Sequence, residues 1–132
     1  MSVVKSKREE STVQFLDNAI DLQVYTLKQC IKFPKRYMFL LTNGIIELAR
    51  NCLFYVKSAN SIFPRNEHEA QMRRDYFIKA NACVMNLYTQ LDIAYECIDE
   101  LSEKTFVKWI ELARNEEKLI KAVMKSDLKR SK

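Results

Sequence analysis

The sequence predicts an all-α fold, an antiparallel up-down-up-down four-helix bundle. The chain of 132 residues holds one glycine and two prolines, too few for the many turns of an all-β domain. Its apolar residues recur in steps of three and four, the spacing that lines one face of a helix. At this length the chain forms one domain with a core of its own. A few long helices are therefore expected.

The first helix is expected from Thr12 to Lys32. Ser11 and Gln14 are predicted to form a capping box, in which each side chain satisfies the other residue's backbone amide. Pro34 ends the helix, because the residue before a proline is pushed out of the helical region. The face predicted to be buried consists of Leu16, Ile20, Val24, Leu27 and Ile31.

The second helix is expected from Lys35 to Ala59, and it carries two apolar stripes. One stripe contains Leu41, Ile45, Leu48, Cys52 and Ala59. The other contains Phe39, Ile46 and Leu53. An apolar arc this wide indicates either a central place in the bundle or burial by a second copy of the chain. The second alternative predicts a homo-oligomer.

The third helix follows a cap formed by Asn66 and Glu69 and is expected to run to about Glu100. Its seam is the most regular pattern in the chain: Phe77, Ala80, Val84, Leu87, Leu91, Ala94, Ile98 and Leu101. Such a heptad repeat is typical of helices that pack at a crossing angle of about 20°.

Ser102 is expected to cap the fourth helix. Its apolar positions are Phe106, Ile110, Ala113, Ile120 and Met124. The bundle is assigned to residues 11–126, between a disordered polar tail (1–10) and a basic tail (127–132).

No catalytic, cofactor or metal site is expected. One glycine cannot build a phosphate-cradling loop. The only histidine, His68, lies in a polar segment at a helix start, so the paired Glu-x-x-His motifs of di-metal bundles are absent. His68 is interpreted as a solvated residue.

The four cysteines are interpreted as buried, reduced thiols of a cytoplasmic protein. They are Cys30, Cys52, Cys83 and Cys97, and none forms a Cys-x-x-Cys pair. Residues 1–10 lack the apolar segment of a signal peptide, and polar residues interrupt the most apolar stretch, 37–56. A membrane partner is therefore not expected.

Positive charge exceeds negative charge, with 22 Lys and Arg against 17 Asp and Glu. Stripes of basic side chains can follow a phosphate backbone, whereas the alternative is an ordinary solvated surface with lysines near helix C-termini. The candidates for binding RNA or DNA are Lys28, Lys32, Lys35, Arg36, Arg50, Lys57, Arg65, Arg73, Arg74, Arg114, Lys118, Lys121 and Lys125. The sequence shows no motif of stacking aromatic residues or base-reading residues, so sequence specificity is not indicated.

A run of acidic residues that contains no basic residue lies at the end of the third helix and just after it: Asp92, Glu96, Asp99, Glu100 and Glu103. It is either a solvated outer face or an acidic patch for a basic partner, including a neighbouring subunit.

The segment Phe33-Pro-Lys-Arg-Tyr-Met-Phe-Leu-Leu-Thr42, followed by an apolar helix and Ala59-Asn60, resembles a four-helix-bundle family with two groups. One group is the accessory variability determinant of diversity-generating retroelements, and the other is the protein of 23S rRNA intervening sequences. The resemblance covers about residues 12–125 in helix order and some ten residues as a motif. Residues 57–64 depart from the intervening-sequence pattern and favour the accessory determinant.

This resemblance implies a basic homopentamer that binds a reverse transcriptase and its template RNA without being an enzyme. It points first to Lys35 and Arg36, then to Arg50 and Lys57. The alternative function is a protein–protein interaction scaffold without a nucleic-acid role, and a structural protein of a mobile element is a third.

Overall fold

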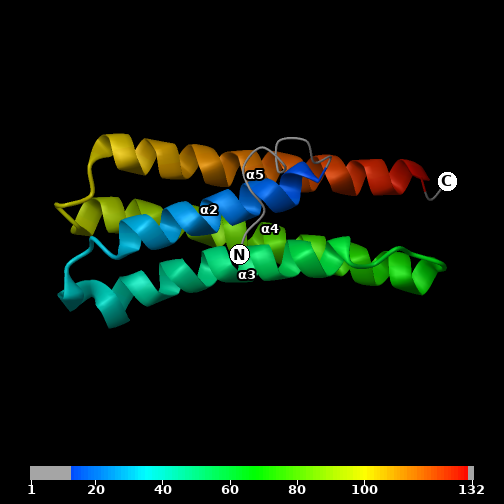
Figure 1. Cartoon of the computed structure of the whole chain (residues 1–132), viewed down its shortest axis with the longest axis horizontal. Helices are drawn as coiled ribbons and strands as arrows, with labels where there is room; N and C mark the ends of the chain where they lie inside the picture. Colours follow the sequence, from blue (N-terminus) through cyan, green and yellow to red (C-terminus); the bar gives the residue numbers. More distant parts are fainter. Residues whose placement is uncertain (1–12, 131–132) are drawn as a thin grey trace.

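The computed structural model describes residues 13–130, and this part of the chain is all helical, without a strand (Figure 1). Its four long helices are α2 (Gln14–Cys30), α3 (Asn43–Asn60), α4 (Glu67–Cys97) and α5 (Glu103–Arg130). The predicted all-α class is thus confirmed. The predicted polar tail, the Ser11 cap and residues 131–132 lie outside the described residues.

Each helix packs beside two others in the bundle. α2 lies against α3 and α5, and α4 lies against the same two helices. Figure 1 shows α2 and α4 running towards one end of the molecule, while α3 and α5 run back towards the other. No helix within residues 13–130 is both long and apolar enough to cross a membrane.

α4 buries the predicted seam. Every seam residue from Phe77 to Leu101 is at most 5% exposed, so this prediction is confirmed. The predicted cap is present as well, because the Asn66 side chain accepts a hydrogen bond of 2.9 Å from the backbone amide of Glu69. α4 ends at Cys97, three residues before the predicted end at Glu100.

α2 buries a different face from the predicted one. The buried residues are Phe15, Ala19, Leu22, Thr26 and Cys30. Of the predicted stripe, Val24, Leu27 and Ile31 are exposed, and Ile31 retains 81% of its accessible surface. The prediction was wrong because both faces have helical spacing. The Trp109 Nε1–H donates to Thr26 Oγ1 at 3.0 Å.

α3 is preceded by a 3₁₀ turn (Lys35–Tyr37) and a π turn (Met38–Thr42), where the sequence predicted continuous helix from Lys35. Of its first predicted stripe, all but the half-buried Leu48 are buried. In the second stripe Ile46 and Leu53 are partly buried, while Phe39 is 88% exposed.

α5 begins after the predicted cap, since the Thr105 amide donates to Ser102 Oγ at 3.2 Å. Its buried residues are Trp109, Ala113, Glu116 and Ile120, and Phe106, Ile110 and Met124 pack partly buried against the core. The helix continues to Arg130, beyond the end assigned to the bundle at residue 126.

Candidate nucleic-acid interface

The predicted basic residues fall into three groups by exposure. Eleven of the thirteen are exposed, Arg74 is half-buried and Arg73 is buried. Three of the exposed side chains pair with an acid one helical turn away or across the α4 cap: Arg50 with Glu47, Arg65 with Glu69, and Lys121 with Glu117. The remaining eight have no ion pair within residues 13–130: Lys28, Lys32, Lys35, Arg36, Lys57, Arg114, Lys118 and Lys125.

Arg73 holds the end of the bundle together instead of facing solvent. Its Nε donates to Asp127 Oδ2 at 2.7 Å, and Nη1 donates to the carbonyls of Ala59 and Ile62 at 3.1 and 3.2 Å. These bonds supply donors to carbonyls at and just after the C-terminal end of α3, where helical amides run out, although the Ala59 carbonyl also accepts the amide of Ile62. A guanidinium with these partners has no free donor edge for a phosphate, so we leave Arg73 out of the interface proposed below.

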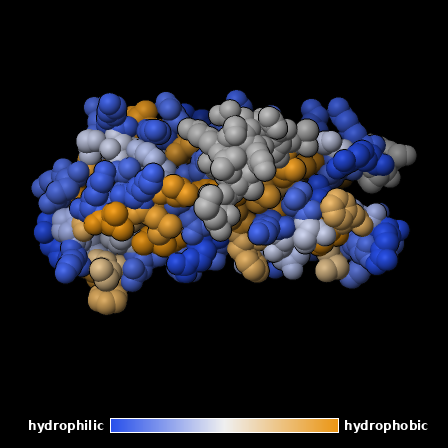
Figure 2. All heavy atoms as spheres, viewed as in Figure 1, coloured by the Kyte–Doolittle hydropathy of each residue, from blue (hydrophilic) through white to orange (hydrophobic). Residues whose placement is uncertain are grey.

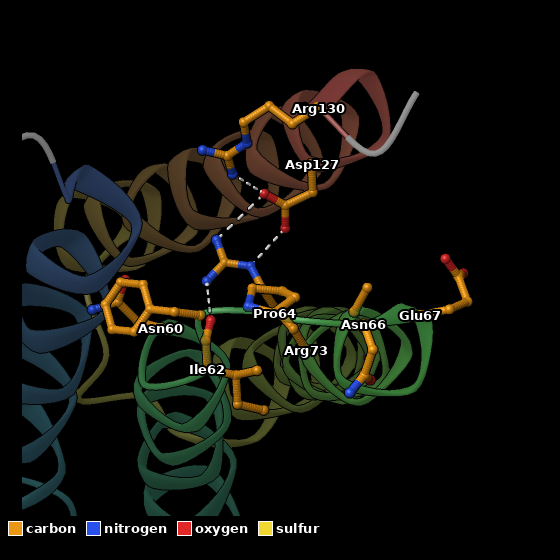
Figure 3. Close-up of a pocket in the computed structure, with 10 residues that line it drawn as sticks. Asn60, Ile62, Pro64, Asn66, Glu67, Arg73, Asp127 and Arg130 are labelled. Carbon is orange, nitrogen blue, oxygen red and sulfur yellow. Dashed lines mark hydrogen bonds and ion pairs between the residues drawn. The ribbon is translucent and has the colours of Figure 1, made fainter.

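A cavity of about 580 Å³ lies over this arginine, between the 61–66 loop and the end of α5. In Figure 3 the side chains of Arg73 and Arg130 converge on Asp127 from opposite sides. Both arginines share the one carboxylate of Asp127, so each cation among the lining residues has an ion pair.

α5 presents the clearest basic surface. Arg114, Lys118, Lys121 and Lys125 follow one another at spacings of four, three and four and are all exposed. The opposite side of the helix carries the buried Ala113, Glu116 and Ile120, so the stripe faces outward. We call these four residues the α5 stripe. Within residues 13–130 the ion pair of the stripe is that of Lys121 with Glu117, whose pKa is lowered by hydrogen bonds from Lys121 and Tyr88.

The basic residues between α2 and α3 lie in a different environment. The Tyr37 hydroxyl donates to the carbonyl of Cys97 at 2.8 Å, which joins the turn after Pro34 to the end of α4. Lys35 and Arg36 therefore lie at the same end of the bundle as the acidic run, which spans the last turns of α4 and the turn after it. All five residues of that run are exposed. This end of the bundle therefore carries both basic and acidic side chains, although some 60 residues separate Lys35 and Arg36 from the acidic run in the sequence.

Glu116 is the polar residue that the sequence interpretation missed. It is fully buried on α5, and Asn18 Nδ2 donates to its Oε1 at 3.0 Å while Oε2 has no partner within residues 13–130. Burial raises the pKa of Glu116 from 4.5 to about 8, and the bond from Asn18 opposes part of that shift. The signal was available, because Glu116 stands three residues after Ala113 and four before Ile120 in the apolar stripe.

The remaining candidates for chemistry are dispersed. His68 is exposed in the first turn of α4. All four cysteines are free thiols, but only Cys30 and Cys52 are buried, and Cys97 is exposed because it ends α4 outside the seam. Within residues 13–130 no three His, Cys, Asp or Glu side chains are grouped to hold a metal ion.

Comparison with known proteins identifies no relative: no family model, no curated protein and no solved structure matches this chain.

Proposed function

We propose that this protein is a non-enzymatic, cytoplasmic nucleic-acid-binding subunit built on an antiparallel up-down-up-down four-helix bundle. The observation that carries the proposal is the α5 stripe, four exposed cations on about three turns of one rigid helix. Cations held at this spacing follow a phosphate backbone and release its counterions on binding, without reading the base sequence.

The helix arrangement supports the proposed topology. Tyr25 near the end of α2 donates to the carbonyl of Thr105 near the start of α5. Asn18, earlier in α2, contacts Leu112 and Glu116, which come later in α5. Contacts that move in opposite directions along two helices are those of an antiparallel pair.

The retroelement role rests on the resemblance of residues 33–42. It adds a reverse transcriptase and its template RNA as partners, and a homo-oligomer as the assembled form. The exposed apolar residues of α2 and the turn before α3 support an assembly: Val24, Leu27, Ile31, Phe39 and Leu40. Figure 2 shows apolar side chains gathered in a band on the face that carries α2 and α3. Contiguous apolar surface of this kind marks an interaction site.

Binding of the purified protein to a structured RNA and to duplex DNA across a salt series tests the nucleic-acid role. We expect log affinity to fall linearly with log salt concentration. Replacing Arg114, Lys118 and Lys125 with Glu should weaken binding at least tenfold and flatten the salt slope, because three phosphate contacts are lost.

The matched control replaces Lys28, Lys32 and Lys35 with Glu, which changes the net charge equally at the mixed-charge end. It should weaken binding less than the α5 variant, with helicity unchanged in both. An equal or larger loss in the control contradicts the assignment to α5. Absence of binding even at low salt contradicts the nucleic-acid role and favours the alternative, a protein–protein scaffold that uses the apolar band.

The oligomer is tested separately by light scattering at micromolar concentration. We expect a mass above that of the 15.6 kDa chain, and Ile31→Lys should lower it, because a charge cannot be buried unpaired in an apolar interface. Val107→Lys, on the exposed face of α5, serves as the control. A monomeric mass for the unaltered protein rules the assembly out.

A further inference from the structure

The outer face of α3 and α4 brings together three aromatic rings that the sequence separates. Phe54 and Tyr55 come from α3, and Tyr76 comes from α4. The ring centroids of Phe54 and Tyr55 lie 5.4 Å apart in an edge-to-face arrangement. Tyr55 and Tyr76 stack at 6.2 Å with an interplanar angle of 28°. We call these three rings the aromatic platform.

The platform is anchored in the core, and Phe54 is its exposed ring. Tyr55 and Tyr76 are partly buried and pack against the core, which holds their rings in place. Phe54 is 60% exposed, so most of its surface lies in water. An uncovered phenyl ring beside two fixed tyrosines offers an apolar surface that is ready for a flat partner and needs little further ordering to bind it.

Positive charge surrounds the platform. Arg50 and Lys57 lie four residues before and three residues after Phe54, on the same side of α3. Lys79 Nζ lies 5.8 Å from the ring centroids of both Tyr55 and Tyr76. Of the nearby acids, Glu47 is paired with Arg50 and Asp75 accepts a hydrogen bond from Gln71. Lys57 and Lys79 have no ion pair within the described residues.

We propose that the aromatic platform stacks an unpaired base of a single-stranded nucleic acid, with Arg50, Lys57 and Lys79 at the flanking phosphates. Aromatic rings among cations are the elements of single-strand binding, because every base has a face that can stack. Bases in a duplex are already stacked on one another, so the site selects single strands over duplexes. The inference rests on the proposed nucleic-acid function and specifies the form of nucleic acid that is bound.

The test compares two strands with the same backbone. One is an oligoadenylate RNA of about 15 nucleotides, and the other is an abasic ribose-phosphate strand of the same length. We expect the full protein to bind the base-containing strand about tenfold more tightly, as measured by fluorescence anisotropy. Phe54→Leu should remove this difference and keep the affinity for the abasic strand, because leucine retains apolar bulk and helix propensity but has no ring.

Two variants complete the design. Phe54→Trp should keep the preference for the base-containing strand, and Phe39→Leu, at an exposed phenylalanine on the turn before α3, should leave it unchanged. Equal binding of the two strands by the unaltered protein overturns the platform and leaves the nucleic-acid function standing. A preference that survives Phe54→Leu overturns it as well. Binding of neither strand at low salt contradicts both the platform and the proposed function.

Discussion

Arg73 and Glu116 are both buried, charge-bearing side chains, yet the bundle accommodates them by opposite means. The donors of Arg73 are received by Asp127 and two backbone carbonyls. Glu116 has one amide donor and one oxygen without a partner in the described part of the chain, and burial raises its pKa to about 8. A buried charge is tolerated when it is paired, and an unpaired carboxyl is tolerated by holding its proton.

The two sites also differ in their place in the bundle. Arg73 lies at the end where α3 stops and α5 finishes, so its loss would release both helix ends. Glu116 lies along α5 and faces α2, where Asn18 also receives a hydrogen bond from Asn115 at 2.9 Å. The first site joins the ends of α3 and α5, and the second links α2 and α5 through a polar network that runs from the buried Glu116 to the exposed Asn115.

The largest expected effect is on the paired site. Arg73→Ala should lower the free energy of unfolding by about 3 kcal/mol, because Asp127 loses one of its two arginine partners and the carbonyls of Ala59 and Ile62 each lose a donor. Urea unfolding followed by circular dichroism measures it. Arg74→Ala, at the half-buried neighbouring arginine, is the control and should cost about 0.5 kcal/mol or less. Similar losses in the two variants would show that the Arg73 contacts do not stabilise the bundle.

A smaller effect is expected at Glu116, and it depends on pH. Because the pKa of Glu116 is higher in the folded chain, the folded state binds more protons than the unfolded state between about pH 4.5 and pH 8. The contribution of Glu116 to stability is therefore greatest below the unfolded pKa and is lost as pH rises through the folded pKa. Glu116→Gln, which cannot ionise, should be more stable than the unaltered protein at about pH 8.

The measurement is the difference in unfolding free energy between Glu116→Gln and the unaltered protein at about pH 6 and pH 8. We expect this difference to grow by about 2 kcal/mol over that interval. Glu117→Gln is the matched control, because the pKa of Glu117 is lowered and its titration lies below the interval. A pH-independent difference for Glu116→Gln would mean that this carboxyl is ionised in the folded bundle at neutral pH.

The contrast between α4 and α2 shows when the spacing of apolar residues predicts the buried face of a helix and when it does not. In α4 the apolar residues form one unbroken seam, so only one face can be buried and the prediction was right throughout. In α2 two stripes share the same spacing, and the sequence favoured the one with larger aliphatic residues. The structure buries the stripe with Phe15, Ala19, Leu22, Thr26 and Cys30, and Trp109 from α5 donates to Thr26 on this face.

The candidate interface divides in the same way. The excess of cations follows from the composition. Helical spacing alone predicts that four of them form one stripe on the last helix. That Arg73 is buried depends on Asp127, 54 residues later, and no local pattern reports such a pairing. The aromatic platform was absent from the sequence interpretation for the same reason, since Tyr55 and Tyr76 meet only across two helices.

The sequence by itself determined the helical class, the stop at Pro34, the caps at Asn66 and Ser102, and the buried face of α4. Each of these depends on residues within one or two helical turns, where backbone geometry and capping act directly. Tertiary structure alone decided which face of α2 is buried, which cations stay in water, and which rings and charges become neighbours. Those outcomes depend on packing and desolvation between distant segments, which only the assembled bundle brings into contact.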